Sequence, residues 1–304
     1  MQAGLAVTVA ELIALAEQAQ RVHYPPKGYA ARIGLHQSRV RGRGMDFSEA
    51  RNYQAGDEVR HMEWRMTART GRPHVKVYHE ERERPVLLVV DFCPSMFFGT
   101  RVAFKSVIAA RLAAILAWTA AEQGDRVGGL LYSPEAHRAF TPRTRRAGVL
   151  PFLAGLSHYS QENQPVSDQG TQAFDQALTR IQRLLKPGSI VVLISDFYHW
   201  QDHHERLLRR LSGHHDLLAY HICDPLELGP PLPQLYGMSD GKKDLLVDTS
   251  LDSVRFGYQF YCEQRITTLT QQMQRIPMQY TQVTSDMNLS LLVKHTFPQR
   301  LRSR

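Results

Sequence analysis

Two aspartates stand directly after apolar stretches that are typical of buried strands. Asp91 follows the run Val86–Val90 and opens the sequence Asp-Phe-Cys-Pro-Ser, and Asp196 follows the run 190–194 and a serine. Open α/β sheets bind ligands at the carboxyl ends of their strands, so we expect both carboxylates at one edge. Thr171, at the start of a predicted helix, adds a hydroxyl. Such oxygen-rich sets suit Mg²⁺ or Mn²⁺, and the alternative is that both aspartates only cap the helices that follow.

The elements that would position these residues alternate along the chain. The patterns predict strands at 86–90, 126–132, 190–194, 217–223, 245–247 and 278–283, and helices at 101–123, 145–156, 172–185, 203–211 and 253–275. Continuous apolar runs are typical of strands that are covered on both faces. Alternation of this kind predicts an α/β fold, a doubly wound, mostly parallel sheet of Rossmann type, across residues 85–283.

The first 84 residues have a different character. Residues 1–22 are predicted to be helical, with Thr8 and Glu11 spaced as in a capping box. The sequence 24–28, Tyr-Pro-Pro-Lys-Gly, ends this helix. Residues 29–84 are polar and rich in Arg and Gly, and cannot build a core alone. We therefore predict an N-terminal docking extension, residues 1–84, packed on a sheet domain of residues 85–304.

Composition narrows the class of protein. The chain has 304 residues, a formal charge of 37 − 29 = +8 and three cysteines. An odd cysteine count in a long chain argues against a disulfide scaffold and for a reducing compartment. No apolar stretch reaches the roughly 20 residues of a membrane span, and the N-terminus does not resemble a secretory signal. We therefore expect a cytoplasmic protein, and the alternative is attachment to a membrane through another molecule.

The arginine clusters and the search for enzyme motifs give less specific indications of function than the strand-end residues. Arginines gather in four clusters, which suit acidic protein partners, nucleic acid or an anionic membrane surface: Arg39/Arg41/Arg43, Arg143/Arg145/Arg146, Arg206/Arg209/Arg210 and Arg300/Arg302/Arg304. Neither a zinc finger nor an RNA-recognition signature is present, and the sequence has no GxSxG elbow and no complete phosphate-binding loop. The histidines near Asp196, among them His199, His203 and His204, are expected on an exposed helix face.

These residues together resemble two known patterns. Asp-x-Ser-x-Ser after a strand, a later Gly-Thr and a later Ser-Asp are similar to the metal-ion-dependent adhesion site of von Willebrand factor A domains, represented here by Asp91, Cys93, Ser95, Thr171 and Asp196. The stretch 47–64, FSEARNYQAGDEVRHMEW, resembles the signature of the bacterial family called domain of unknown function 58. Asp224-Pro225-Leu226-Glu227 with Leu232-Pro233 extends this resemblance, which spans roughly residues 35–250.

The resemblance implies a von Willebrand factor A-like fold and a non-catalytic role in protein–protein interaction. Members of that family are associated with MoxR-type AAA+ ATPases as adaptor partners. By the same resemblance, Asp91, Ser95 and Thr171 would hold Mg²⁺, Asp196 would act directly or through water, and a carboxylate of the partner would complete the octahedron. The alternatives are a metal-dependent hydrolase at the same strand ends and a nucleic-acid binder that uses the arginine clusters.

Three residues carry sharper expectations. Cys93 replaces a serine of the adhesion motif, and because a thiol is a soft ligand we expect weak Mg²⁺ binding that Cys93→Ser tightens. Asp91→Ala is expected to abolish partner capture and to spare the fold, because the carboxylate would stand at the surface end of a strand. Trp64 is expected to be a buried anchor of the extension, with Trp64→Ala costing about 3–5 kcal/mol.

Overall fold

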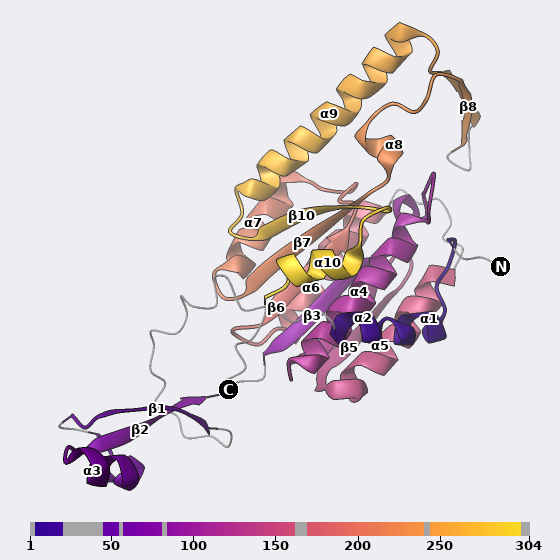
Figure 1. Cartoon of the computed structure of the whole chain (residues 1–304). Helices are drawn as coiled ribbons and strands as arrows, with labels where there is room; N and C mark the ends of the chain where they lie inside the picture. Colours follow the sequence, from indigo (N-terminus) through magenta and orange to yellow (C-terminus); the bar gives the residue numbers. More distant parts are fainter. Residues whose placement is uncertain are drawn as a thin grey trace. The chain divides into compact units, whose positions relative to one another are not determined.

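The computed structural model describes residues 4–20, 45–54, 57–80, 84–161, 169–239 and 244–298 (Figure 1). It separates into two compact units, Met1–Tyr24 with Arg84–Phe297, and Pro25–Glu83 with Pro298–Arg304. Gly56 and two of the predicted arginine clusters, Arg39/Arg41/Arg43 and Arg300/Arg302/Arg304, lie outside the described residues.

The first unit contains a six-stranded sheet. Its strands lie in the order β10 (Gln279–Thr284), β7 (Asp216–Cys223), β6 (Ile190–Ser195), β3 (Pro85–Asp91), β4 (Arg126–Tyr132) and β5 (His137–Thr144). Neighbouring strands are parallel except for β4 and β5. The predicted mixed α/β architecture with a mostly parallel sheet is therefore confirmed. The edge strand β5 was not predicted, because its residues alternate between polar and apolar only weakly.

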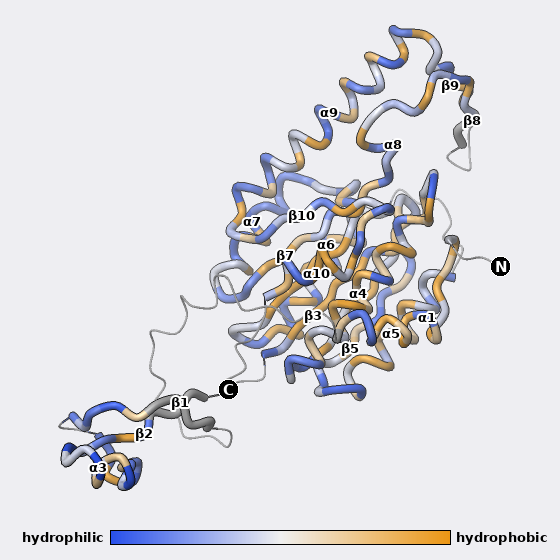
Figure 2. Tube along the Cα trace, in the orientation of Figure 1, coloured by the Kyte–Doolittle hydropathy of each residue, from blue (hydrophilic) through white to orange (hydrophobic). Residues whose placement is uncertain are grey.

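Helices cover both faces of this sheet, as its apolar strands require. Side chains alternate along a strand, so Val86, Leu88 and Val90 face one core with α4 (Lys105–Glu122) and α5 (Arg145–Gln161). Leu87 and Val89 face a second core with α6 (Gly170–Leu184), α7 (Asp202–Ser212) and the end of α9 (Asp252–Gln274). Figure 2 shows the resulting apolar interior around β3 and α4.

The N-terminal helix packs with the sheet unit. It forms two short segments, α1 (Val9–Ala14) and α2 (Ala16–Gln20), and the Thr8 hydroxyl caps α1 as predicted. Leu12 is fully buried, and its carbonyl accepts a hydrogen bond from the indole N–H of Trp118 on α4 at 3.0 Å. Glu11 pairs with Arg111 at 2.6 Å. The last helix of this unit, α10 (Leu289–Thr296), packs against α4 as well.

The second unit holds the family-signature stretch. The strands β1 (Met45–Asn52) and β2 (His74–Glu80) pair antiparallel, and they are joined through a short 3-10 turn, Val59–His61, and the helix α3 (Trp64–Thr70). Asp57 accepts hydrogen bonds from Arg51 at 2.7 Å and from the Gln54 amide at 2.9 Å. Trp64 is 64% exposed, so the expectation of a buried anchor is wrong.

A projecting arm follows β7 in the first unit. It consists of the short helix α8 (Pro225–Leu228), the hairpin β8 (Leu235–Ser239) with β9 (Asp244–Asp248), and α9. Figure 1 shows the hairpin at the end of α9 that lies away from the sheet. The predicted strand at 245–247 therefore belongs to this hairpin and not to the main sheet. Among the described residues, no helix is long and apolar enough to cross a membrane.

Candidate functional site

Asp91 ends β3 and is bound on both oxygens. Its Oδ1 accepts the backbone N–H of Cys93 at 2.7 Å, and its Oδ2 accepts the hydroxyl of Ser195 at 2.6 Å. The Ser195 oxygen in turn accepts the Phe197 N–H at 2.9 Å. Asp91 is 3% exposed, so the expectation of a surface carboxylate is wrong. Its hydrogen bonds fasten the ends of β3 and β6 together instead of capping an α-helix.

Asp196, one residue beyond β6, forms the start of a chain of charges. Its Oδ1 accepts the Tyr198 N–H at 3.0 Å, and its Oδ2 accepts the Lys105 ammonium at 2.7 Å. The same ammonium donates to Glu227 of α8 at 2.7 Å, and Arg265 of α9 lies 3.5 Å from Glu227. Asp196 is fully buried and Lys105 is 3% exposed. Side chains from β6, α4, α8 and α9 therefore meet in one buried network.

Lys105 occupies an unusual place for a cation, because it is the first residue of the 18-residue helix α4. The helix macrodipole is positive at that end and disfavours a positive side chain there. Burial adds a further cost to the charged form. The carboxylates of Asp196 and Glu227 offset both costs, so the lysine is held at this position by its acidic partners and not by helix propensity.

The two aspartates differ in their electrostatic surroundings. Burial, followed by the nearby charge of Asp196, raises the pKa of Asp91. Burial alone would raise the pKa of Asp196 as well, but the Lys105 ammonium and the Tyr198 N–H hold it below its usual range. Burial opposes the charged form of Lys105, yet the carboxylates of Asp196 and Glu227 leave its pKa raised. An ionised Asp196 paired with a charged lysine is thus the stable form.

The structure brings four of the five predicted metal-site residues together. Asp91 contacts Cys93, as described, and the Ser95 hydroxyl is close enough to Asp196 to favour its ionised form. In the described part of the chain, Ser95 Oγ is buried without a hydrogen-bond partner of ordinary geometry. Thr171 is the second residue of α6 and is half-buried, and no hydrogen bond of the described residues joins it to the other four.

This donor set fits an ammonium better than a divalent cation. Mg²⁺ requires octahedral oxygen ligands at about 2.1 Å, and the free hydroxyl of Ser95 could supply one of them. Both oxygens of Asp196 are already engaged, Oδ2 by the Lys105 ammonium and Oδ1 by the Tyr198 N–H. Cys93 is fully buried, and burial, then the Asp91 charge, raises the pKa of its thiol, which disfavours the thiolate that binds metals. The function proposed below therefore does not use a metal at this site, and the magnesium site stays a prediction.

Sequence reasoning missed several residues of this network, namely Lys105, His221, Glu227 and Arg265. Lys105 could have been found from the sequence, because a lysine at the start of an otherwise buried apolar helix needs an acidic partner. For Glu227 the available signal was the Asp224-Pro-Leu-Glu sequence, which forms a capping box in α8. His221 lies inside β7, 1% exposed, with its Nδ1 2.6 Å from the Tyr280 hydroxyl and its Nε2 3.3 Å from Cys223 Sγ.

A second group of titratable side chains joins α6 to α7. Asp175 Oδ1 lies 2.6 Å from His203 Nε2 and 2.9 Å from His204 Nε2. The Gln201 N–H donates to His204 Nδ1, so we assign the proton of the neutral ring to Nε2, which leaves that atom no lone pair for a metal. Burial lowers the pKa of His204 and supports the neutral ring. The expectation of an exposed helix face is wrong for His204, which is fully buried.

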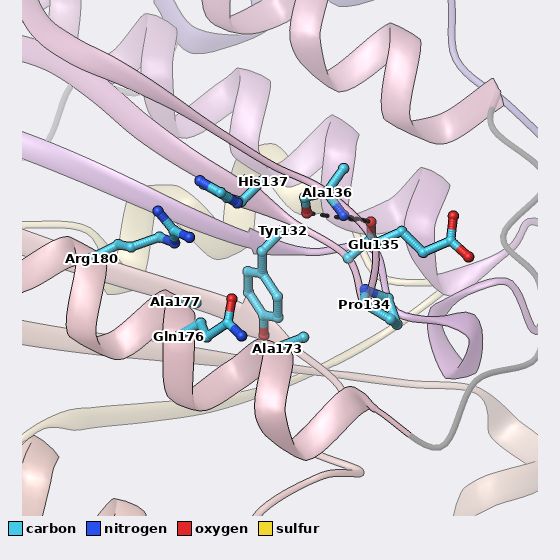
Figure 3. Close-up of a pocket in the computed structure, with 10 residues that line it drawn as sticks. Tyr132, Pro134, Glu135, Ala136, His137, Ala173, Gln176, Ala177 and Arg180 are labelled. Atoms are coloured by element: carbon cyan, nitrogen blue, oxygen red, sulfur yellow. Dashed lines mark hydrogen bonds between the residues drawn. The ribbon is translucent and has the colours of Figure 1, made fainter.

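A small cavity lies beside Tyr132, at the end of β4. Figure 3 shows its lining, with the Tyr132 ring directed toward Ala173 of α6 and with His137 and Arg180 to one side. Its volume of about 30 Å³ admits little more than one or two water molecules. It is too small for an organic substrate.

A larger groove runs between the loop after β6 and α9, with a volume of about 330 Å³. Its walls include the aromatic rings of Tyr198, Trp200 and Tyr261 together with Arg265. The Arg265 guanidinium stacks 5.0 Å from the Tyr198 ring centre. Arg265 Nη2 and Trp200 Nε1 are buried and have no hydrogen-bond partner among the described residues. The groove thus combines aromatic walls with a guanidinium, and Arg265 connects it to the charge network.

Comparison with known proteins identifies the family. The family model described as "Protein of unknown function DUF58" matches residues 49–267, so the chain belongs to that family, as its signature stretch predicted. Over 222 residues the chain is 31% identical to the uncharacterised protein Mb1516 of Mycobacterium bovis, covering 72% of this chain and 68% of that one. The uncharacterised protein Rv1480 of Mycobacterium tuberculosis matches with the same values.

Solved structures share a more distant likeness. BatB of Bacteroides thetaiotaomicron superposes with a TM-score of 0.43 and 13% identity, covering 70% of this chain and 96% of that one. An aerotolerance-related membrane protein of Bacteroides fragilis gives a TM-score of 0.40 and 14% identity over the same shares. Scores this low establish nothing further about the fold or the function of this chain.

Proposed function

We propose that this protein is a non-catalytic protein-interaction module, von Willebrand factor A-like in fold, that serves as adaptor or partner of a MoxR-type AAA+ ATPase in the cytoplasm. The groove beside the strand ends is the observation that carries the proposal. The chain belongs to the family whose signature residues 47–64 resemble, and the association of that family with MoxR-type ATPases, which the resemblance implies, is the reason for choosing this partner.

The strand-end acids support a positioning role in this proposal. Asp91 and Asp196 are buried and bind groups of this chain on all four carboxylate oxygens. A partner cannot reach them without opening the fold. Asp196 holds the Tyr198 amide directly, and Asp91 holds the Phe197 amide through the Ser195 hydroxyl, which fixes the loop that forms one wall of the groove. Through Lys105 and Glu227, Asp196 is also linked to Arg265 on the other wall.

The donors of the groove define the chemistry of the partner. Arg265 lines the groove and holds its guanidinium over the exposed Tyr198 ring, and a carboxylate is the acceptor that a guanidinium binds best. Tyr198 and Tyr261 are 57% and 62% exposed and provide flat apolar contact around the donors. Aromatic residues and arginine are the side chains that most often dominate binding energy at interfaces. We therefore propose that an acidic segment of the ATPase enters the groove.

Binding of the purified protein to the MoxR-type ATPase from the same organism tests this function. Calorimetry should show that Arg265→Gln binds the ATPase at least about tenfold more weakly than wild type does. The reason is that a hydrogen bond to a charged group contributes about 1.5–3 kcal/mol. Trp200→Phe makes an aromatic wall of the groove smaller and should weaken binding by a smaller factor. Arg209→Gln removes an equal charge from a half-exposed site on α7 and serves as the matched control, with unchanged affinity expected.

Wild-type affinity of both groove variants would contradict the proposed contact, and the search would then move to the second unit, around the exposed Trp64. Metal-dependent turnover of a phosphoester by the purified protein would contradict the non-catalytic assignment itself. Steeply salt-sensitive binding to generic DNA would instead support the nucleic-acid alternative.

A further inference from the structure

We infer that the Lys105 ammonium takes the place that a divalent cation has in a metal-ion-dependent adhesion site, so that this edge of the sheet is held together without a metal. The inference concerns the site alone. It stands or falls independently of the ATPase partner proposed above.

The position of the ammonium supports this inference first. Lys105 Nζ lies 2.7 Å from Asp196 and 2.7 Å from Glu227, so it bridges two carboxylates from different segments as a resident cation would. The ring of Phe98 lies 5.9 Å from the same nitrogen. Lys105 is 3% exposed, and the partners Asp196 and Glu227 have side chains that are 0% and 17% exposed. The cation is therefore enclosed by this chain and is not exchanged with solvent.

The balance of charge supports it independently. The network holds two cations, Lys105 and Arg265, and two carboxylates with close cationic partners, Asp196 and Glu227. Asp91 has no cationic partner among the described residues and instead accepts two neutral hydrogen bonds. A divalent cation added to this balanced set would leave a buried positive excess, which is costly without further anions.

The ligands also depart from what a hard cation needs. Of the two serine positions in the adhesion pattern, one is Cys93, whose buried thiol is a poor ligand for Mg²⁺. Ser95 keeps its hydroxyl, which lies near Asp196 but makes no hydrogen bond of ordinary geometry among the described residues. One free hydroxyl cannot replace the coordination that Asp196 gives to Lys105. The chain thus keeps some residues of the adhesion pattern, among them Ser95 and Asp196, but its resident cation is the covalently attached ammonium of Lys105.

Cation binding by matched variants tests the inference. Wild type and Lys105→Arg, which keeps the charge, should show no binding heat with Mg²⁺ or Mn²⁺ and no shift in melting temperature at millimolar cation. Lys105→Met removes the charge and should melt lower, and Mg²⁺ or Mn²⁺ should restore part of the loss. The double variant Lys105→Met/Cys93→Ser should bind the cation more tightly than Lys105→Met, because it regains a hard hydroxyl ligand.

Three outcomes would overturn the inference. Wild type could bind Mg²⁺ as tightly as Lys105→Met, or Lys105→Met and the double variant could fold and bind no cation. If Lys105→Met does not fold, a titration of wild type with Mn²⁺ replaces that comparison. The third overturning outcome is saturable Mn²⁺ binding by wild type that Lys105→Arg or Asp196→Asn weakens, because a metal and not the ammonium would then hold the site.

Discussion

Asp91 and Asp196 lie in one buried cluster, yet their surroundings favour opposite charge states, and this predicts unequal substitution costs. Asp196→Asn leaves the buried Lys105 ammonium with Glu227 alone, and breaking a buried ion pair costs about 3–5 kcal/mol. Asp91 has a raised pKa and neutral donors, so Asp91→Asn should cost about 1 kcal/mol. Urea denaturation at pH 7 measures both free energies of unfolding. Equal losses would show that Asp91 carries a charge that the network needs.

At the same scale, the sequence predicts the strand-end residues well and their partners poorly. Asp91, Cys93, Ser95 and Asp196 follow apolar runs that end at one sheet edge, so the strand-end rule is sufficient to group them. Lys105 joins them only because α4 starts beside that edge, and Glu227 and Arg265 only because the arm folds back. Spacing along the chain carries no information about these contacts.

Among the elements, the packing of α6 against the loop after β6 depends on a single glycine. A Cβ at Gly170 would lie 2.1 Å from the His199 ring, so Gly170→Ala must displace that ring. We expect a loss of about 1–3 kcal/mol, as for other overpacked sites. Gly213, at the end of α7, has an ordinary φ of −67° and a nearest neighbour at 3.5 Å.

Gly213→Ala is therefore the matched control, and its free energy of unfolding should change little or rise slightly. Chemical denaturation of both variants makes the comparison. A Gly170→Ala protein as stable as the control would show that His199 moves away without cost.

The elements that the sequence predicts correctly are those with long apolar periodicity. The strands β3, β6 and β7 and the helix α4 are buried almost throughout, and their boundaries differ from the prediction by a few residues. The strand β5 was missed because only Phe140 is buried in its eight residues. β9 was assigned correctly as a strand but to the wrong sheet, because its pairing with β8 is set by the arm.

For the molecule as a whole, buried histidines predict acid sensitivity. Burial lowers the pKa of His221 from 6.5 to about 3, and the carboxylate of Asp196 only partly opposes this. Below pH 6.5 the unfolded chain therefore gains a proton that the folded chain does not, and stability falls as the pH falls. Between pH 7 and pH 5 the loss from this residue should be about 2 kcal/mol. Burial lowers the pKa of His204 and His215 in the same direction.

His221→Gln isolates this contribution, because an amide can still hydrogen-bond to the Tyr280 hydroxyl and does not titrate. The free energy of unfolding, measured by urea denaturation at pH 7 and at pH 5, should drop by about 2 kcal/mol less for the variant than for wild type. Parallel losses in the two proteins would mean that His221 is protonated in the folded state.

The charge network also constrains how this sequence can diverge during evolution. Lys105 lies 91 residues from Asp196 and 122 residues from Glu227 along the chain, yet each depends on the same ammonium. A mutation that neutralises one of these three residues leaves a buried charge without its partner until a second mutation compensates for it. Relatives should therefore carry the lysine and both acids together or have lost them together, and chains with only part of the set should be rare. Gene conversion or recombination that separates these three codons would be counter-selected for the same reason.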